Sequence, residues 1–252
     1  MAEIRNQDLI EYLLRLGDNT LVLGQRVSEW CGHAPVIEED VALTNVALDL
    51  IGQARQLLSY AGELEGQGRD EDALAFLRDD REFRNLTLVE LERGDFGRTV
   101  LRNALFSAFQ VVLWQALVSS SDSRLAAIAE KSLKESRYHL RYSADWVVSL
   151  GDGTDESRRR MQAALNELWN YVPEMFTTDE VEARLEGIVP SSAKLRAEWN
   201  KLVLPVLAQA TLRVPAEPTY VSRGKFGFHS EALGHMLAEM QFLQRAYPGG
   251  NW

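Results

Sequence analysis

Residues 133–146 read LKESRYHLRYSADW, which places an acid at Glu135 and an imidazole one helical turn later at His139. Residues three or four positions apart share one face of an α-helix, so both side chains can point into the same bundle of helices. A carboxylate and an imidazole on one helix face form half of the ligand set of many di-iron bundle proteins. The stretch therefore predicts a helical bundle and raises the question of whether it holds a metal.

Helical patterning runs through nearly the whole chain. Apolar residues recur roughly every 3.6 positions, and glycine-rich stops such as EGQG at 65–68 and GDG at 151–153 interrupt them. The pattern predicts long helices at about 7–30, 38–64, 96–119 and 123–150. Two long hairpins joined by one long connection are the layout of a ferritin-like four-helix bundle.

The remaining sequence predicts accessory helices on that bundle. Further helical stretches are expected at about 154–176, 191–212 and 230–246. No flexible linker precedes them, so we expect a single domain over residues 1–252, with a core bundle at about 7–150 and accessory helices at about 154–246. The predicted fold class is all-α: a ferritin-like four-helix bundle with additional C-terminal helices.

Composition and charge exclude several classes of function. The formal net charge is −10 and no run of lysines or arginines is available, which argues against nucleic-acid binding. Cys31 is the sole cysteine, so one chain offers neither a disulfide framework nor a thiolate metal site. The N-terminus lacks a signal-peptide pattern, and the most hydrophobic stretch, LVLPVLAQATL at 202–212, is too short to span a bilayer. We therefore expect a cytoplasmic protein that contacts no membrane.

The second and fourth helices do not supply matching metal ligands. A di-iron bundle needs Glu-x-x-His on each of two helices, yet Tyr138 stands three residues after Glu135 and His139 stands four after it. An offset of 86 residues lays Asp49 on Glu135 and Gly52 on Tyr138. No histidine lies near these second-helix positions, so the second half of the site has no imidazole.

The first and third helices leave the ligand set incomplete. The polar stripe of the third helix, Asn103, Ser107 and Gln110, should face inward but contains no carboxylate. The first helix offers Asp18, with Arg15 one turn before it. We interpret the interior acids and the histidine as a buried polar network, without a bound metal or cofactor and without catalytic residues. The expected partners in that network are Arg15, Asn45, Gln53, Arg55 and Arg141, and the positions left from a metal site are Asp18, Asp49, Gly52, Glu135, Tyr138 and His139.

Two other groups of polar residues are weaker candidates. In HSEALGH, His229 precedes Glu231 and His235, and Glu239 follows one turn later. The sequence lacks His-Glu-x-x-His, so surface or packing roles are expected. His33 lies beside Cys31 in a loop and is expected to be structural.

Four stretches together resemble one protein family. They are LRLGDNTLVLGQRVSEWCGHAP (14–35), ALDLIGQARQLLSYAGEL (47–64), KESRYHLRYSADWVVSLGDGT (134–154) and HSEALGHMLAEMQFLQRAYPGGNW (229–252). In this order they resemble the structural, C-type subunit of the bacterial phenylacetyl-CoA 1,2-epoxidase, also called ring-hydroxylating phenylacetate-CoA oxygenase. The resemblance spans nearly the whole chain and is weakest at 66–95 and 176–225.

The resemblance implies a function within a multicomponent oxygenase. Its family folds as a ferritin-like bundle and accompanies a related catalytic subunit that holds the di-iron centre and binds the acyl-CoA. A small bridging subunit and a reductase with flavin, an iron–sulfur cluster and NADPH complete the hetero-oligomer, which epoxidises the aromatic ring with dioxygen. The C-type subunit keeps the fold without iron. Candidate interface anchors are Trp30, Trp146, Trp169, Tyr171 and Trp199, although core packing is the role expected for most of them.

Three hypotheses follow from the sequence. The first is a non-catalytic structural subunit that scaffolds the di-iron partner. The second is a ferritin-like metal-dependent oxidase that uses a reduced site of Asp18, Asp49, Glu135 and His139. The third is a helical adaptor with no oxygenase partner.

Overall fold

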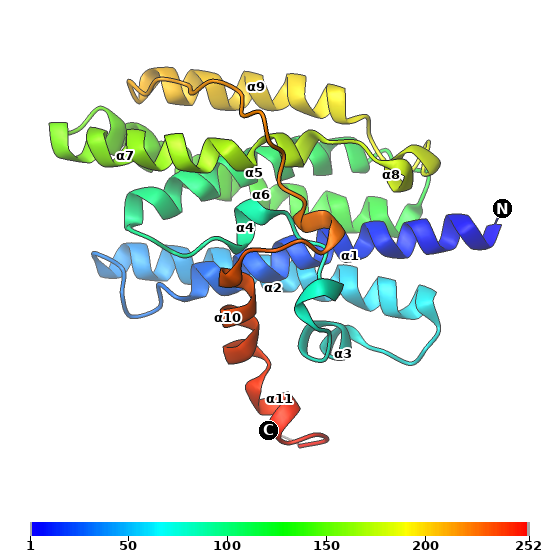
Figure 1. Cartoon of the computed structure of the whole chain (residues 1–252). Coiled ribbons are helices and arrows are strands. Elements are labelled where there is room, and N and C mark those ends of the chain that lie inside the picture. Colours follow the sequence, from blue (N-terminus) through cyan, green and yellow to red (C-terminus); the bar gives the residue numbers. More distant parts are fainter. Residues whose placement is uncertain (1, 251–252) are drawn as a thin grey trace. The chain divides into compact units, whose positions relative to one another are not determined.

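The computed structural model describes residues 2–250 and consists of helices joined by turns and loops, as Figure 1 shows. Within these residues the only β-type pairings are two isolated bridges, Glu186–Val189 and Arg223–Phe228. The long helices are α1 (Ala2–Ser28), α2 (Ile37–Glu65), α5 (Phe96–Leu117), α6 (Ser123–Gly151), α7 (Asp155–Leu168), α9 (Ser192–Gln209) and α10 (Glu231–Met240). Short helices are α3 (Glu71–Phe76), α4 (Thr87–Glu90), α8 (Glu180–Arg184) and α11 (Phe242–Ala246), with 3₁₀ turns at Asp80–Glu82, Trp169–Tyr171, Pro173–Phe176 and Gly224–Phe226.

The chain divides into two compact units. Unit 1 comprises residues 1–30, 42–92 and 222–252, and unit 2 comprises residues 31–41 and 93–221. The accessory helices are thus shared: α7, α8 and α9 belong to unit 2, whereas α10 and α11 belong to unit 1. The expectation of a single domain over 1–252 stays a prediction.

Two glycines bring α1 and α2 of unit 1 close together. A Cβ atom added at Gly17 would lie 2.7 Å from Leu58 Cδ2, and one added at Gly24 would lie 3.1 Å from Ile51 Cγ1 and 3.4 Å from the Ala47 carbonyl oxygen. A side chain at Gly17 would therefore require Leu58 to move, and one at Gly24 would require Ile51 to shift by a few tenths of an ångström. The motif RLGDNTLVLG therefore contributes to the fold by its small residues as well as by its apolar ones.

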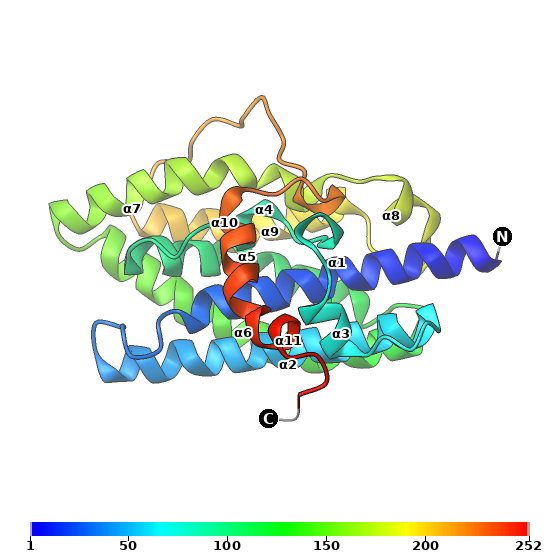
Figure 2. The same cartoon turned by 60° about the horizontal axis from the view of Figure 1, so that its bottom comes forward.

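The C-terminal helices of unit 1 are tied to the connection after α2. Gln241 donates from Nε2 to the carbonyl oxygens of Ala75 and Arg78, both at 3.0 Å. Arg245 donates from Nη2 to the Arg78 carbonyl at 2.8 Å and pairs with Asp79 at 2.9 Å. Figure 2 shows α11 beside α3, as these contacts require.

In unit 2, α5 is the central helix. It packs most extensively against α6 and also contacts α7 and α9, and Trp199 of α9 donates from Nε1 to the Leu105 carbonyl at 2.9 Å. By length and composition α5 could cross a membrane, but 83% of its most apolar window is buried inside the fold, as in core helices of soluble proteins. The expectation that no stretch is long and apolar enough to span a bilayer is therefore wrong by length and composition alone, because α5 meets both criteria.

Most predicted helices are confirmed, and the differences have local causes. Asp95 and Asp122 are the N-caps of α5 and α6, accepting from Arg98 N and Leu125 N at 2.8 Å each. The stretch predicted at 154–176 is not one helix: α7 ends at Leu168 and 3₁₀ turns follow, the second beginning at Pro173, which has no N–H to donate. Helix α8 was not expected.

Replacing Gly62 by alanine should destabilise the protein. A Cβ atom at Gly62 in α2 would lie 2.1 Å from the Arg69 carbonyl oxygen, so the backbone of the turn after α2 must move. Overpacking of this kind costs roughly 1–3 kcal/mol. We expect a lower urea midpoint for Gly62→Ala, measured by far-ultraviolet circular dichroism.

Gly52→Ala is the matched control on the same helix. Apart from its chain neighbours and the nearby backbone of α2 itself, no atom lies within 4 Å of the added methyl group, and alanine is better than glycine in a helix interior by about 1 kcal/mol. Stabilisation by Gly52→Ala and destabilisation by Gly62→Ala are expected together; equal effects of the two would contradict the close approach at Gly62.

Candidate functional site

The most buried charged group of α1 is Asp18, whose carboxylate is held by an arginine. The Asp18 side chain is 0% exposed and that of Arg78 is 3% exposed. Arg78 Nη1 donates to Asp18 Oδ2 at 3.0 Å, and its Nη2 donates to Oδ1. The backbone N–H of Arg84 donates to the same Oδ2 at 2.8 Å. The carboxylate is thus neutralised and hydrogen-bonded, as a buried charge must be.

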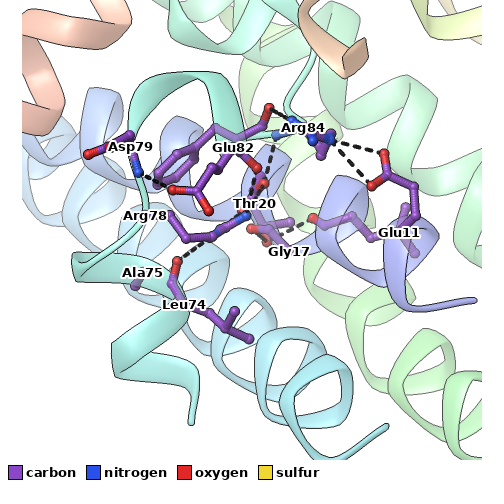
Figure 3. A network of polar contacts seen from close by, with 12 residues as sticks. Glu11, Gly17, Thr20, Leu74, Ala75, Arg78, Asp79, Glu82 and Arg84 are labelled. Carbon is purple, nitrogen blue, oxygen red and sulfur yellow. Dashed lines mark hydrogen bonds and ion pairs between the residues drawn. The ribbon is translucent and has the colours of Figure 1, made fainter. Parts of the chain in front are cut away.

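Arg78 uses its whole guanidinium group in this cluster (Figure 3). Besides the bonds to Asp18, Nε donates to the Leu74 carbonyl and Nη1 donates to the Glu82 carbonyl at 3.2 Å. Its carbon Cζ lies 4.4 Å from the centre of the Phe83 ring. Asp18 of α1 is therefore bound, directly or through Arg78, to several residues of the segment 74–84 that follows α2.

A second buried cluster in unit 1 joins α4 to the C-terminal segment. The Glu90 side chain is 0% exposed and that of His229 is 4% exposed, with Nδ1 of His229 2.6 Å from Glu90 Oε2. Glu90 Oε1 accepts from the Ser230 N–H at 2.6 Å, and Oε2 accepts from Asn85 Nδ2 at 2.8 Å. Arg26 donates from Nε to the Glu90 carbonyl at 2.9 Å. His229 is therefore a packing histidine, as expected.

The other members of the HSEALGH group lie apart from this cluster. Glu231, His235 and Glu239 are exposed on α10, whereas His229 binds Glu90. In the loop after α1, Cys31 and His33 are both exposed, and His33 Nδ1 lies 3.0 Å from the Cys31 carbonyl oxygen. Neither group forms a candidate metal or catalytic site.

The positions expected to remain from a metal site differ widely in burial. His139 is 1% exposed and Asp18 is 0% exposed, so both side chains are buried. Asp49, Gly52 and Glu135 are half-buried. Glu135 lies on α6, where Oε1 is 3.7 Å from Lys131 Nζ.

The interior position expected for Tyr138 is wrong. Its side chain is 43% exposed, because the buried face of α6 carries Ser132, Ser136, His139 and Ser143, and one residue along an α-helix is a rotation of about 100°. Tyr138 instead stacks on Tyr142 of the next turn. It belongs to a different face of α6 from the one that a metal-binding histidine would need.

The polar stripe expected in the third helix is confirmed. Asn103, Ser107 and Gln110 of α5 are 2%, 3% and 1% exposed. Arg102 beside them is 0% exposed, which the sequence pattern did not indicate. The buried face of α5 therefore carries amides, a hydroxyl and a cation where a di-iron bundle needs a carboxylate.

This donor set does not fit a di-iron centre. Asp18, one of the four candidate ligands, is already paired with the cation of Arg78. Among residues 2–250, no cluster of three or more His, Cys, Asp or Glu side chains is arranged to hold a metal ion. The absence of a bound metal remains a prediction, but the chemistry of the residues present supports a buried polar network.

A third cluster, in unit 2, joins the start of α2 to α6. Glu39 of the first turn of α2 accepts at Oε2 from the Tyr142 hydroxyl and from Trp146 Nε1, the latter at 2.8 Å. Burial of Tyr142 and the adjacent Glu39 carboxylate raise the pKa of the phenol well above its ordinary value. Trp146 packs edge-on against Phe96, with 5.0 Å between ring centres.

Comparison with known proteins decides the family. The sequence matches the phenylacetic acid catabolic protein family over residues 1–252. The chain belongs to this family. It is 53% identical over 246 residues to the C-type subunit of the 1,2-phenylacetyl-CoA epoxidase of Escherichia coli strain K12, a match that covers 97% of this chain and 99% of that protein. The all-α, ferritin-like fold class and the resemblance seen in the sequence are thereby confirmed.

Sequence reasoning missed the main partners of this phenylacetic acid catabolic protein's polar clusters. Arg78 and Glu90 lie in the connection at 66–95, where the resemblance is weakest and no helical periodicity sets the side-chain directions. Of the arginines expected as interior partners, Arg55 has a side chain that is 75% exposed and pairs with Glu71, and Arg141 is exposed beside Tyr138. Only a tally of buried charges could have indicated that Asp18 needs a distant cation.

Removing the Asp18 carboxylate should be strongly destabilising. Asp18→Ala leaves the buried Arg78 guanidinium without its counter-ion, which costs roughly 3–5 kcal/mol of unfolding free energy. Chemical denaturation of the purified chain measures this loss. The double variant Asp18→Leu/Arg78→Met should recover most of it, because no charge then stays buried.

Glu180→Ala is the control for the Asp18 variant. Its carboxylate pairs with Arg184, but the Glu180 side chain is 91% exposed, and surface substitutions of this kind stay within about 0.5 kcal/mol. An equally small effect of Asp18→Ala would contradict the structural role of the buried pair.

Tyr142 should make stability sensitive to alkaline pH. Because its folded pKa is raised above the ordinary value of 10.0, its contribution is present below pH 10.0 and is lost as pH rises above it, where the unfolded chain ionises first. We expect Tyr142→Phe to be less stable than wild type at about pH 8, where phenols are still protonated, with the difference narrowing above pH 10.0. The exposed Tyr220→Phe variant is the control and should give a curve parallel to wild type.

Proposed function

We propose that this chain is the non-catalytic structural subunit of a multicomponent phenylacetyl-CoA 1,2-epoxidase that acts in aerobic phenylacetate breakdown. The observation that carries the proposal is the end-to-end 53% identity with the C-type subunit of the Escherichia coli enzyme. The Asp18–Arg78 pair supports it, because a carboxylate committed to an arginine stabilises the fold and is not offered to iron.

The proposed partners are those of a complete oxygenase. A ferritin-like catalytic subunit would hold the di-iron centre, a small bridging subunit would join the assembly, and a reductase with flavin and an iron–sulfur cluster would supply electrons from NADPH. The complex is placed in the cytoplasm. This chain would hold its partner in position and would contribute no catalytic residue.

The aromatic anchors expected from the sequence are largely core residues. Trp30, Trp169 and Trp199 are 7%, 2% and 0% exposed, so no partner can reach them. In contrast, three apolar residues at the start of α2 expose 52%, 74% and 56% of their surface: Val36, Ile37 and Val41. Exposed large apolar side chains gathered in one segment are typical of protein interfaces, and we assign this segment to the catalytic partner.

Co-purification tests the proposal and the interface together. The chain, expressed with a tagged catalytic subunit, should be retained by that subunit, and phenylacetyl-CoA turnover should depend on it. Ile37→Asp/Val41→Asp should reduce retention by about tenfold or more, because a charge buried in an apolar contact is costly.

Leu204→Asp serves as the control for that pair. Leu204 of α9 is 40% exposed and lies away from the start of α2 in sequence, so the same change there should leave retention intact. If the wild-type chain is not retained and turnover is indifferent to it, the chain is a helical adaptor of another system.

Metal analysis separates the scaffold from the metal-dependent oxidase. When iron or manganese is added to the purified chain, the amount of bound metal should remain well below one equivalent per chain. Glu135→Ala should not change that amount. Near-stoichiometric metal that is lost in Glu135→Ala and His139→Ala would instead support a reduced site of Asp18, Asp49, Glu135 and His139.

A further inference from the structure

An aromatic stripe runs along the partly exposed face of α6. Tyr138, Tyr142 and Trp146 follow one another at intervals of four residues, which places them on one side of the helix. The rings of Tyr138 and Tyr142 are stacked, with 6.4 Å between centres and 18° between planes. Tyr138 is 43% exposed, whereas Tyr142 and Trp146 are half-buried. The stripe thus runs from two half-buried rings to an exposed one.

One carboxylate serves the two inner members of this stripe. Glu39 Oε2 accepts from both the Tyr142 hydroxyl and the Trp146 indole N–H. Packing alone would not require a carboxylate beneath two aromatic donors. A phenol that loses an electron becomes a strong acid, so a hydrogen-bonded carboxylate is the group that can take its proton within the same step.

Tyr142 is also kept in the form that such a step needs. Burial and the Glu39 carboxylate raise the pKa of its phenol, so the hydroxyl stays protonated until an electron leaves. Tyr138 differs, because its ring is exposed and Arg141 lies over it, with Cζ 5.7 Å from the ring centre. A positive charge beside the ring does not supply a proton acceptor, so water takes that role at the surface.

We propose that Trp146, Tyr142 and Tyr138 form a relay that carries single oxidising equivalents to the protein surface, with Glu39 as the internal proton acceptor. An oxidised Trp146 takes one electron from Tyr142, whose hydroxyl proton passes to Glu39. The neutral Tyr142 radical then takes an electron from Tyr138; Tyr142 recovers its proton from Glu39 and Tyr138 releases its own to water. A small thiol finally gives a hydrogen atom to the Tyr138 radical and becomes a thiyl radical, two of which combine as a disulfide.

The source of the oxidising equivalents rests on the proposed function. A dioxygen-activating partner is a source of strong one-electron oxidants when turnover fails, and the relay would then protect the assembly. The segment assigned to that partner includes Ile37 and Val41, the neighbours of Glu39 in the first turns of α2. The electron path itself lies within this chain and can be tested without a partner.

Pulse radiolysis of the full chain with azide radical tests the path. Azide radical oxidises accessible indoles, and four tryptophans are at least nine-tenths buried: Trp30, Trp114, Trp169 and Trp199. Trp252 lies outside the described residues and is changed to Phe in all samples. We expect the tryptophanyl absorption to decay while tyrosyl absorption grows, and a spin trap to mark Tyr138 in peptide mass spectra.

Two variants test the roles of the inner residues. Tyr142→Phe should abolish labelling of Tyr138 and prolong the tryptophanyl signal. Glu39→Gln keeps a hydrogen-bond acceptor but removes the base, and should slow tyrosyl growth roughly hundredfold, the usual contribution of a positioned base. Tyr220→Phe removes an exposed phenol outside the stripe and should leave the decay unchanged.

The relay would be overturned by either of two results. One is a tryptophanyl decay that is the same in wild type and Tyr142→Phe; the other is spin-trap labelling of Tyr220 or Tyr247 in preference to Tyr138. Circular dichroism of each variant confirms that it is folded. Because no partner is present, failure here leaves the proposed structural role standing, and failure of co-purification leaves the relay standing.

Discussion

The buried ion pair between Asp18 and Arg78 is the constraint on which unit 1 depends. A carboxylate inside a helical pair must be neutralised, and here the cation comes from the connection after α2. That choice fixes the path of residues 74–84, which in turn receive Gln241 and Arg245 of the C-terminal segment. Buried polar contacts, in addition to apolar packing, therefore determine where the C-terminal segment of unit 1 binds the connection after α2.

The same pair supports the proposal that this ferritin-like chain binds no iron. In a metal-binding bundle, interior carboxylates are held in place by the cations they bind. In this chain an arginine performs that electrostatic role for Asp18, and buried amides and hydroxyls of α5 replace further acids. A guanidinium offers directional hydrogen bonds but no open coordination position, so it stabilises the fold and brings no oxygen chemistry. This suits a subunit whose task is support.

Helix α6 shows how one residue of offset separates two roles. His139 faces the interior among serines, whereas Tyr138 begins an aromatic stripe that continues through Tyr142 and Trp146. The stripe ends on Glu39, a residue about a hundred positions earlier in the chain. An aromatic face whose half-buried end binds a carboxylate is suited to chemistry as well as to packing.

The sequence alone determined most of the long helices, because apolar periodicity and caps such as Asp122 act within a few residues. It did not show that the stretch at 154–176 breaks after Leu168. It also determined the inward direction of Asp18, Asn103 and His139, which local helical geometry fixes. The tertiary structure decided their partners. Arg78 lies 60 residues from Asp18 in an aperiodic connection, and nothing local sets the direction of its side chain. Ion pairs between residues far apart in sequence depend on which segments the fold brings together. Only the folded structure shows which segments these are.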